Sequence, residues 1–229
     1  MASRADQLVL DLPLRPALGA EDFIVSASNA EAVKMIDRWP HWPAPALILC
    51  GPAGSGKTHL GHVWRMVSAA RLIKAAGLTE ELALELAAGR GALVESVDTE
   101  LGSETALFHL LNLAKEQGFH VLITARKLPG KWRIALPDLR SRVRSFPVAE
   151  IGLPDENLLR AVLVKLLGDR QLPATPHGVN HLVRHMDRSM EMALLLVEEI
   201  DRMLWTQPGP VTRSVAAKAL ARVRHQDTE

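Results

Sequence analysis

The chain has 229 residues, of which 48% are hydrophobic and 23% are charged, so it is long enough to bury a full core and too apolar to be disordered. Its 27 Lys and Arg residues against 26 Asp and Glu residues give a net charge of +1, which provides no bulk attraction to nucleic acid or anionic lipid. The single cysteine excludes an internal disulfide, no apolar run approaches the roughly 18 residues of a membrane span, and the first residues lack a secretory signal. We therefore expect a cytoplasmic protein with no membrane contact.

The beginning of the chain is predicted to be an extended arm. Leu8, Leu10 and Leu12 recur with the period of two residues that is typical of an extended segment. Pro13 follows directly and stops any regular element from continuing. We therefore expect residues 1–20 to form an arm outside the folded chain.

The next part of the chain alternates short apolar runs with amphipathic stretches. Helices are predicted over 29–38, 57–70, 79–88 and 104–116, and strands over 46–50, 72–73, 92–97, 121–124 and 146–148. This alternation favours an α/β fold in which helices cover both faces of a parallel sheet. Beyond Pro154 the strand patterns stop, and a small all-helical domain is expected. Its predicted helices are 155–167, 177–186, 189–205 and 212–223.

One segment matches the phosphate-binding P-loop pattern G-x-x-x-x-G-K-[ST] in full, between a predicted strand and a predicted helix. It consists of Gly51, Pro52, Ala53, Gly54, Ser55, Gly56, Lys57 and Thr58, and His59 follows. The glycines let backbone N–H groups surround phosphate oxygens at the positive end of the helix dipole. Lys57 is expected to reach the β- and γ-phosphates, and the Thr58 hydroxyl to bind Mg²⁺. The sequence thus predicts a site for ADP or ATP with Mg²⁺.

In such a site, a nearby strand normally ends in two acidic residues. One contributes to the Mg²⁺ coordination shell, and the other orients the attacking water. Here the predicted strand ends in Glu95 and Ser96. Glu95 can serve the metal through water, or it is only a solvated residue at a strand end. Ser96 is neutral and cannot act as a carboxylate base, and Asp98 shares its face only if the strand continues that far. We expect a chain that holds a nucleotide well and hydrolyses it poorly.

Further segments narrow the class of P-loop protein. They are DFIV at 22–25, SN at 28–29, GKTHL at 56–60, LIT at 122–124, LRSRV at 139–143 and DRSME at 187–191. Together they resemble the DnaA family of replication initiators, which are AAA+ ATPases. The resemblance covers residues 22 to about 205. It implies an AAA+ P-loop sheet flanked by helices over residues 21–150, followed by a small helical lid over residues 151–229.

The resemblance implies roles for residues on both sides of the P-loop. Phe23, Ile24 and Val25 would lie near the adenine, and a plain core role is the open alternative. Thr124 would be the sensor I residue at the end of its strand. Arg188 would be the sensor II arginine, which reaches the β- or γ-phosphate, unless it only pairs with a local acid at a helix start.

The resemblance also identifies Arg142 as an arginine finger, with Arg140 as the fallback. A finger supplies a planar cation to the transferring phosphoryl group. Here it would act in trans, on ATP that is bound to a neighbouring DnaA molecule. A plain surface arginine in the cluster of residues 140–144 is the alternative.

Two features differ from an initiator. The chain ends at Glu229, and we expect no helix-turn-helix domain. The arm resembles the peptide by which bacterial proteins bind the β subunit sliding clamp of DNA polymerase, with anchors at Gln7, Leu8, Leu10 and Leu12. A strand that docks on the chain's own sheet is the alternative.

These features resemble the regulatory inactivators within the DnaA family. Such a protein, with a nucleotide bound and docked on a DNA-loaded clamp, stimulates ATP hydrolysis by DnaA and so limits initiation of chromosome replication. The implied partners are DnaA and the clamp. The sequence leaves open whether the chain forms a homodimer, and no sequence-specific DNA binding is expected. The competing hypotheses are a self-sufficient P-loop ATPase and a DnaA-like DNA-binding protein.

Three histidines, His177, His181 and His185, recur at helical spacing. They could in principle line up as metal ligands on one helix face. Because no cysteine or acidic fourth ligand is apparent, a solvated helix face is the favoured interpretation.

Overall fold

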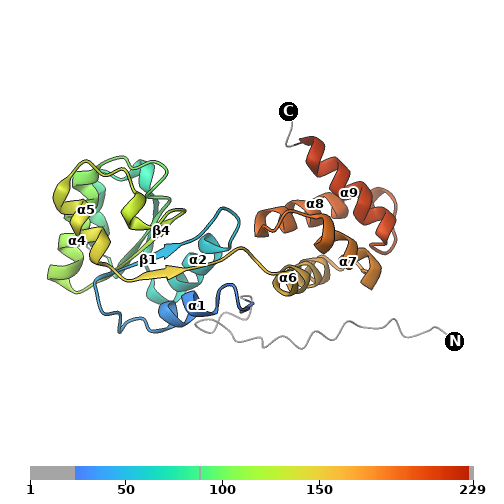
Figure 1. Cartoon of the computed structure of the whole chain (residues 1–229), viewed down its shortest axis with the longest axis horizontal. Coiled ribbons are helices and arrows are strands. Elements are labelled where there is room, and N and C mark those ends of the chain that lie inside the picture. The colour runs from blue at the N-terminus through green and yellow to red at the C-terminus, as the bar shows by residue number, and fades with distance from the viewer. Residues whose placement is uncertain (1–23, 88, 227–229) are drawn as a thin grey trace. The chain divides into compact units, whose positions relative to one another are not determined.

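The computed structural model describes residues 24–87 and 89–226, which fall into two compact units that meet in sequence between Leu153 and Pro154. We call residues 24–153 the base unit and residues 154–226 the lid unit (Figure 1). Each unit has its own buried apolar cluster. No helix in the described ranges combines the length and the apolar character needed to cross a membrane.

The base unit alternates helices and strands, as the sequence predicts. Its elements are α1 (Ala30–Asp37), β1 (Ala46–Cys50), α2 (Lys57–Ser68), β2 (Arg71–Lys74), η1 (Ala75–Gly77), α3 (Glu80–Ala87), β3 (Gly91–Glu95), α4 (Glu104–Gln117), β4 (His120–Ala125), η2 (Pro129–Lys131), α5 (Pro137–Ser145) and β5 (Val148–Glu150). Within the described residues the strands form one sheet in the order β2-β3-β4-β1-β5, and every paired neighbour is parallel. The predicted α/β fold, a parallel sheet covered by helices, is confirmed.

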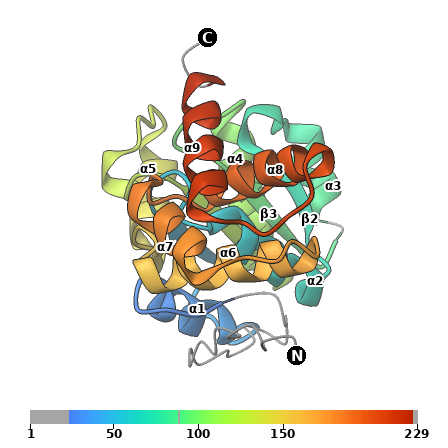
Figure 2. The ribbon, with the colours of Figure 1, turned by 90° about the vertical axis from the view of Figure 1, so that its right-hand side faces the viewer.

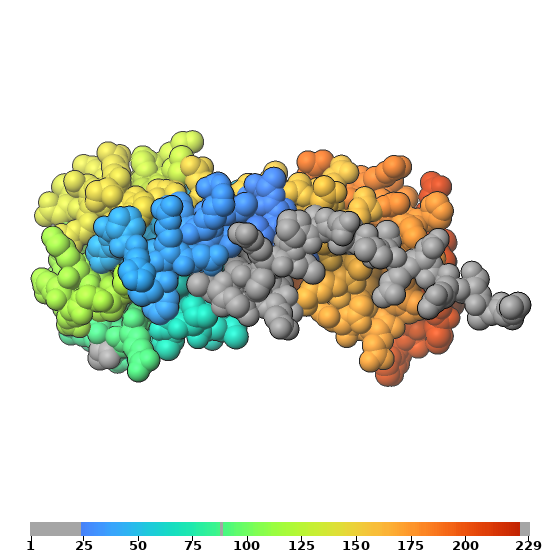
Figure 3. Space-filling model, turned by 90° about the horizontal axis from the view of Figure 1, so that it is seen from below, coloured from blue at the N-terminus to red at the C-terminus, as the bar shows by residue number. Residues whose placement is uncertain are grey.

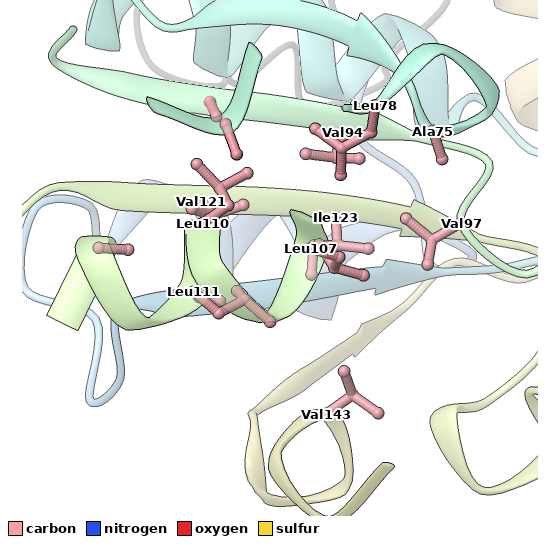
Figure 4. Close-up of a cluster of buried hydrophobic side chains, with 14 of the residues drawn as sticks. Ala75, Leu78, Val94, Val97, Leu107, Leu110, Leu111, Val121, Ile123 and Val143 are labelled. Carbon is pink, nitrogen blue, oxygen red and sulfur yellow. The ribbon is translucent and has the colours of Figure 1, made fainter. Parts of the chain in front are cut away.

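Successive side chains of each strand point to opposite faces of the sheet, and helices cover both faces of its inner strands. Ile123 of β4 lies with Leu107 of α4 in the cluster that also holds buried residues of α3 and α5 (Figure 4). On the other face, Leu49 of β1 belongs with Trp64 of α2 and with buried residues of α1. The surface on the α1 side is seen in Figure 3, where α1 is blue. This double coverage explains why the strands are continuous apolar runs in the sequence.

The described part of the lid unit is helical. Its helices are α6 (Glu156–Asp169), α7 (Pro176–His185), α8 (Met190–Thr206) and α9 (Arg213–Gln226) (Figure 2). Asp155, Thr175 and Ser189 each precede a helix, and their side chains accept a hydrogen bond from a backbone N–H in its first turn. Such N-caps stabilise a helix by about 1 kcal/mol each.

Several element bounds differ from the sequence prediction. The strand predicted over 92–97 ends at Glu95, because Ser96 has a φ of 64° and turns the chain out of the sheet. The last strand is Val148–Glu150 rather than 146–148, since Phe146 closes helix α5. Helix α5 itself is not predicted by the apolar pattern.

Candidate functional site

The P-loop joins β1 to α2 at the carboxyl edge of the sheet. Gly54 and Gly56 have φ values of 67° and 97°, and Gly56 is the N-cap of α2. Only glycine adopts this left-handed conformation without strain. A Cβ on Gly51 would lie 2.4 Å from the carbonyl oxygen of Ile151, which follows β5. The motif glycines are therefore required by the backbone geometry of the loop.

The ammonium group of Lys57 folds back over the loop. Its Nζ donates to the carbonyl oxygens of Gly51 at 2.7 Å and Pro52 at 2.6 Å, and lies 3.4 Å from Oγ of the buried Ser55. Burial lowers the pKa of Lys57, and the charge of Arg126 lowers it further, whereas Cys50 and Asp98 act in the opposite direction. A phosphate in the loop would favour the charged ammonium. Lys57 can therefore exchange its carbonyl partners for phosphate oxygens.

The segment before α1 is tied to the same edge of the sheet. The side chain of Asn29 donates to the carbonyl oxygen of Ile24 at 3.0 Å and accepts from the backbone N–H of Ser26 at 2.8 Å. The N–H of Gly152 donates to the carbonyl oxygen of Ser28 at 2.9 Å, directly after Ile151. These bonds hold the segment with the buried Ile24 and half-buried Val25 close to the chain that follows β5.

The end of β3 is coupled to the end of β4 by the predicted sensor I residue. The hydroxyl oxygen of the buried Thr124 accepts from the N–H of Ser96 at 3.1 Å, and its carbonyl oxygen accepts from the N–H of Val97 at 3.1 Å. Because parallel strands end at one edge of the sheet, this pair lies on the side where the P-loop leaves β1. Thr124 thus fixes the turn that carries Ser96.

The residues that the sequence assigns to Mg²⁺ have suitable donor atoms. Glu95 is 9% exposed, and its Oε1 has no hydrogen-bond partner in the described structure. A buried carboxylate oxygen left without a donor suits a hydrated cation. The exposed hydroxyl of Thr58 is a second oxygen ligand. The described residues contain no group of three or more His, Cys, Asp or Glu that could hold a metal alone. Mg²⁺ would therefore depend on phosphate oxygens and water as well, as it commonly does.

Asp98 does not replace the missing acid, because the strand stops before it. Its Oδ1 accepts from the N–H of Arg126 at 2.9 Å, and its Oδ2 accepts from the N–H of Lys127 at 2.8 Å. Both carboxylate oxygens are therefore engaged in holding the loop that follows β4. Sequence reasoning missed this role, because the bonds join residues 28 and 29 positions apart.

Arg142 lies on α5 and is held by two side chains of α4. Its guanidinium carbon is 4.7 Å from the centroid of the Phe108 ring, and its Nη1 donates to Oδ1 of Asn112. Arg140, the fallback, is exposed on the same helix. The sequence analysis missed Phe108 and Asn112, although their spacing of four residues on a predicted helix indicates that they share a face.

In the lid unit, Arg188 lies just before α8. Its Nη2 is 3.2 Å from Oε1 of Glu156, and the two side chains are 58% and 54% exposed. The local pair that the sequence left open as an alternative is thus present. An exposed ion pair of this kind contributes at most about 1 kcal/mol, so Arg188 can leave Glu156 at little cost.

The fold is similar to solved structures of the replication initiator. Domain III of Thermotoga maritima DnaA matches with a TM-score of 0.75 and 20% identity, over 92% of this chain and 98% of that one. The chain has an AAA+ fold. AMPPCP-bound DnaA from Aquifex aeolicus matches with a TM-score of 0.66 and 17% identity, over 94% and 71% of the two chains. The Thermotoga maritima RuvB branch migration motor matches with 0.63 and 14%, over 77% and 61%.

No protein-family model matches the sequence, and no curated protein matches it either. The structural likeness therefore shows the fold alone. Within the AAA+ base unit, the predicted P-loop, Glu95, Ser96 and Thr124 meet at one edge of the sheet. The predicted clamp-binding residues lie outside the described residues, as does Phe23. They are Gln7, Leu8, Leu10 and Leu12.

Proposed function

We propose that this chain is a regulatory AAA+ protein of the Hda type, which holds an adenine nucleotide, binds the sliding clamp and stimulates ATP hydrolysis by DnaA. The proposal depends most on one observation. An intact P-loop shares the carboxyl edge of the sheet with β3, which ends at Glu95 and is followed by a neutral Ser96, and both oxygens of Asp98 are engaged elsewhere. A site of this kind suits retention of a nucleotide better than its turnover.

The nucleotide is ADP or ATP with Mg²⁺. The P-loop N–H groups and Lys57 would bind the phosphates, Thr58 and Glu95 would bind Mg²⁺, and the segment at Ile24 would line the adenine. The similar DnaA structure from Aquifex aeolicus is bound to AMPPCP, an adenine nucleotide analogue, which supports this choice. Arg188 would report the phosphates from the lid unit.

The catalytic contribution is made in trans by Arg142. A guanidinium that enters a neighbouring ATP site offsets the charge that develops on the transferring phosphoryl group, and such a finger raises the rate roughly 10³- to 10⁵-fold. Phe108 and Asn112 support this role, because they hold the side chain in one place on the surface of α5. The likeness of the fold to that of DnaA supports a DnaA molecule as the neighbour.

The test of the finger is ATP hydrolysis by DnaA in the presence of the clamp loaded on DNA. The Arg142→Ala variant is expected to lose the stimulation and to keep its fold and nucleotide. Arg140→Ala and Arg144→Ala are matched controls, since both residues are exposed on the same helix. Undiminished stimulation by Arg142→Ala would refute the assignment, and loss only in Arg140→Ala would transfer it to Arg140.

The test of the clamp contact is retention on an immobilised clamp. The double variant Gln7→Ala/Leu8→Ala is expected to lose retention and to bind ADP like the unaltered chain. A chain with Ala in place of Asp6, outside the predicted anchors, is the control. Retention that survives the double variant would place the clamp contact elsewhere.

A self-sufficient ATPase is the second candidate, favoured by the likeness to the RuvB motor. This alternative predicts steady ATP consumption by the purified chain without DnaA. The proposed regulator predicts a single slow turnover, after which ADP stays bound. Quantifying bound and released ADP after mixing with radiolabelled ATP separates the two.

A further inference from the structure

The charges of the lid unit are separated between its helices. Helices α7 and α9 contain no Asp or Glu in their sequences, PHGVNHLVRH and RSVAAKALARVRHQ, whereas α6 and α8 carry the acidic residues of the described lid helices. The net charge of +1 for the whole chain conceals this separation. We define the α7–α9 face by its cationic and imidazole side chains. They are His177, His181, Arg184 and His185 on α7, and Arg213 and Arg224 on α9.

The two helices lie side by side and run in the same direction (Figure 2). At their starts, the N–H of Thr175 donates to the carbonyl oxygen of Val211 at 3.1 Å. At the end of α7, Nη2 of Arg224 donates to the carbonyl oxygen of His185 at 2.5 Å. Contacts at both ends therefore hold the two helices against each other along their length.

Side chains along this surface also lie close together. The rings of His181 and His185 have centroids 4.2 Å apart. Burial lowers the pKa of His181, and His185 and then Arg213 lower it further. Arg213 therefore acts on α7 from the neighbouring helix, near the start of the surface. Arg184 shares the helix face of His181, because three residues separate them.

One cation on each of the two helices has no described acid as an ion-pair partner. Arg184 and Arg213 are exposed and form no ion pair with a described carboxylate. By contrast, Arg222 on the same α9 helix lies 3.0 Å from the buried Glu199 and is excluded from the face. The described carboxylate nearest to Arg184 in the sequence is that of Asp187, which is exposed just beyond α7.

The chemistry of the face fits a row of phosphates. At 1.5 Å per residue the ten residues of α7 extend about 15 Å, which is long enough to follow several phosphates of a duplex. The exposed residues between the cations of α9 include Ala217 and Ala221, which allow a backbone to come close. Apart from its histidines, the face has no aromatic side chain for stacking on bases, and it has no large apolar one for entering a lipid bilayer.

We propose that the α7–α9 face binds the phosphate backbone of duplex DNA without reading its sequence. This site lies within the lid unit and does not depend on the proposed clamp or DnaA contacts. Sequence-independent affinities of this kind are about 10⁻⁴ to 10⁻⁶ M and fall steeply with salt. Such a contact would hold the protein along a duplex that another factor has already engaged.

The experiment measures fluorescence anisotropy of two labelled duplexes of unrelated sequence, titrated with the full chain in ADP and Mg²⁺ at several salt concentrations. Equal binding of both duplexes is expected, with log K falling linearly against log salt. The double variant Arg184→Gln/Arg213→Gln should bind about 10-fold more weakly or worse, and its salt slope should be smaller by about 2, one for each lost phosphate contact. The matched control is Lys165→Gln/Arg170→Gln, which removes two cations that face acidic partners on other lid surfaces.

Several outcomes would overturn the proposal. Equal weakening in both double variants would mean that only net charge matters. Tighter binding to a single-stranded oligonucleotide would point to a different ligand, and retention on phosphatidylserine vesicles without duplex binding would point to a membrane surface. Absence of binding at low salt would refute the site outright. Thermal unfolding of each variant shows that the lid unit is still folded.

Discussion

The guanidinium of Arg142 lies over the ring of Phe108, with 4.7 Å between its central carbon and the ring centroid. The same guanidinium donates to Asn112, one helical turn along α4 from Phe108. A long arginine side chain on a surface normally loses about 2 kcal/mol of rotamer entropy when it is fixed. Here α4 has fixed it before any partner arrives, so less entropy remains to be lost on binding.

Phe108→Leu is therefore expected to weaken the stimulation of DnaA without removing Arg142. A cation–π contact at an exposed site contributes about 0.5–1 kcal/mol, which corresponds to a roughly two- to five-fold loss. The measurement is DnaA-dependent ATP hydrolysis against the concentration of the variant. His109→Leu, at the neighbouring exposed position of α4, is the control. A Phe108→Leu variant as active as the control would show that the ring does not position the finger.

Gly51→Ala is expected to damage the P-loop, and Gly77→Ala is its matched control. The new Cβ at position 51 would lie 2.4 Å from the carbonyl oxygen of Ile151, whereas at position 77 it would meet nothing within 4 Å. Overpacking against backbone costs about 1–3 kcal/mol. We expect a lower Tm for Gly51→Ala and loss of the Tm increase on addition of ADP and Mg²⁺. An ADP response equal to that of Gly77→Ala would contradict the geometry proposed for the loop.

Much of the fold could be predicted from local patterns. Strand β1 has the predicted bounds, because its five residues are all buried and form one apolar run that ends at a glycine turn. The caps Asp155 and Ser189 are visible in the sequence, because a short polar side chain precedes an amphipathic stretch in each case.

The features that escaped prediction depend on few or distant contacts. Helix α5 buries only Leu139 and Val143, and its remaining residues give no apolar periodicity that could reveal it. The left-handed Ser96 and the carboxylate of Asp98 are explained only by partners on β4 and the loop after it. The P-loop motif of the candidate site could therefore be predicted from the sequence, whereas the contacts that orient the neighbouring residues could not.

Thr124→Val is expected to destabilise the base unit, because it leaves the N–H of Ser96 without its acceptor. The hydroxyl oxygen of Thr124 accepts that bond at 3.1 Å, and the residue is 3% exposed. Because Ser96 is exposed and the bond is only part-buried, its loss costs about the 0.5–1.5 kcal/mol of an ordinary hydrogen bond. Thr124→Ser keeps the acceptor and should lose less. The free energy of unfolding in urea measures both variants, and equal losses would mean that the methyl group, not the hydroxyl, stabilises this turn.

His120 is expected to make stability depend on pH. Its ring makes edge contacts with Trp39 and Trp42, at centroid distances of 6.5 and 5.5 Å, and burial lowers its pKa from the ordinary 6.5. Well above pH 6.5 the imidazole is neutral in both the folded and the unfolded chain, so it does not make the free energy of unfolding depend on pH. As the pH falls through 6.5, the unfolded chain binds a proton more readily than the folded one, so stability falls.

His120→Phe keeps an aromatic ring beside Trp42 and cannot bind a proton. The decrease in the free energy of unfolding between pH 7.5 and 5.5 is therefore expected to be smaller in this variant than in the unaltered chain. Urea titrations at both pH values measure the difference. His41→Phe, at an exposed position, is the control and should keep the full decrease. If His120→Phe loses as much stability as the control on acidification, protonation of the half-buried imidazole of His120 does not cause the pH dependence.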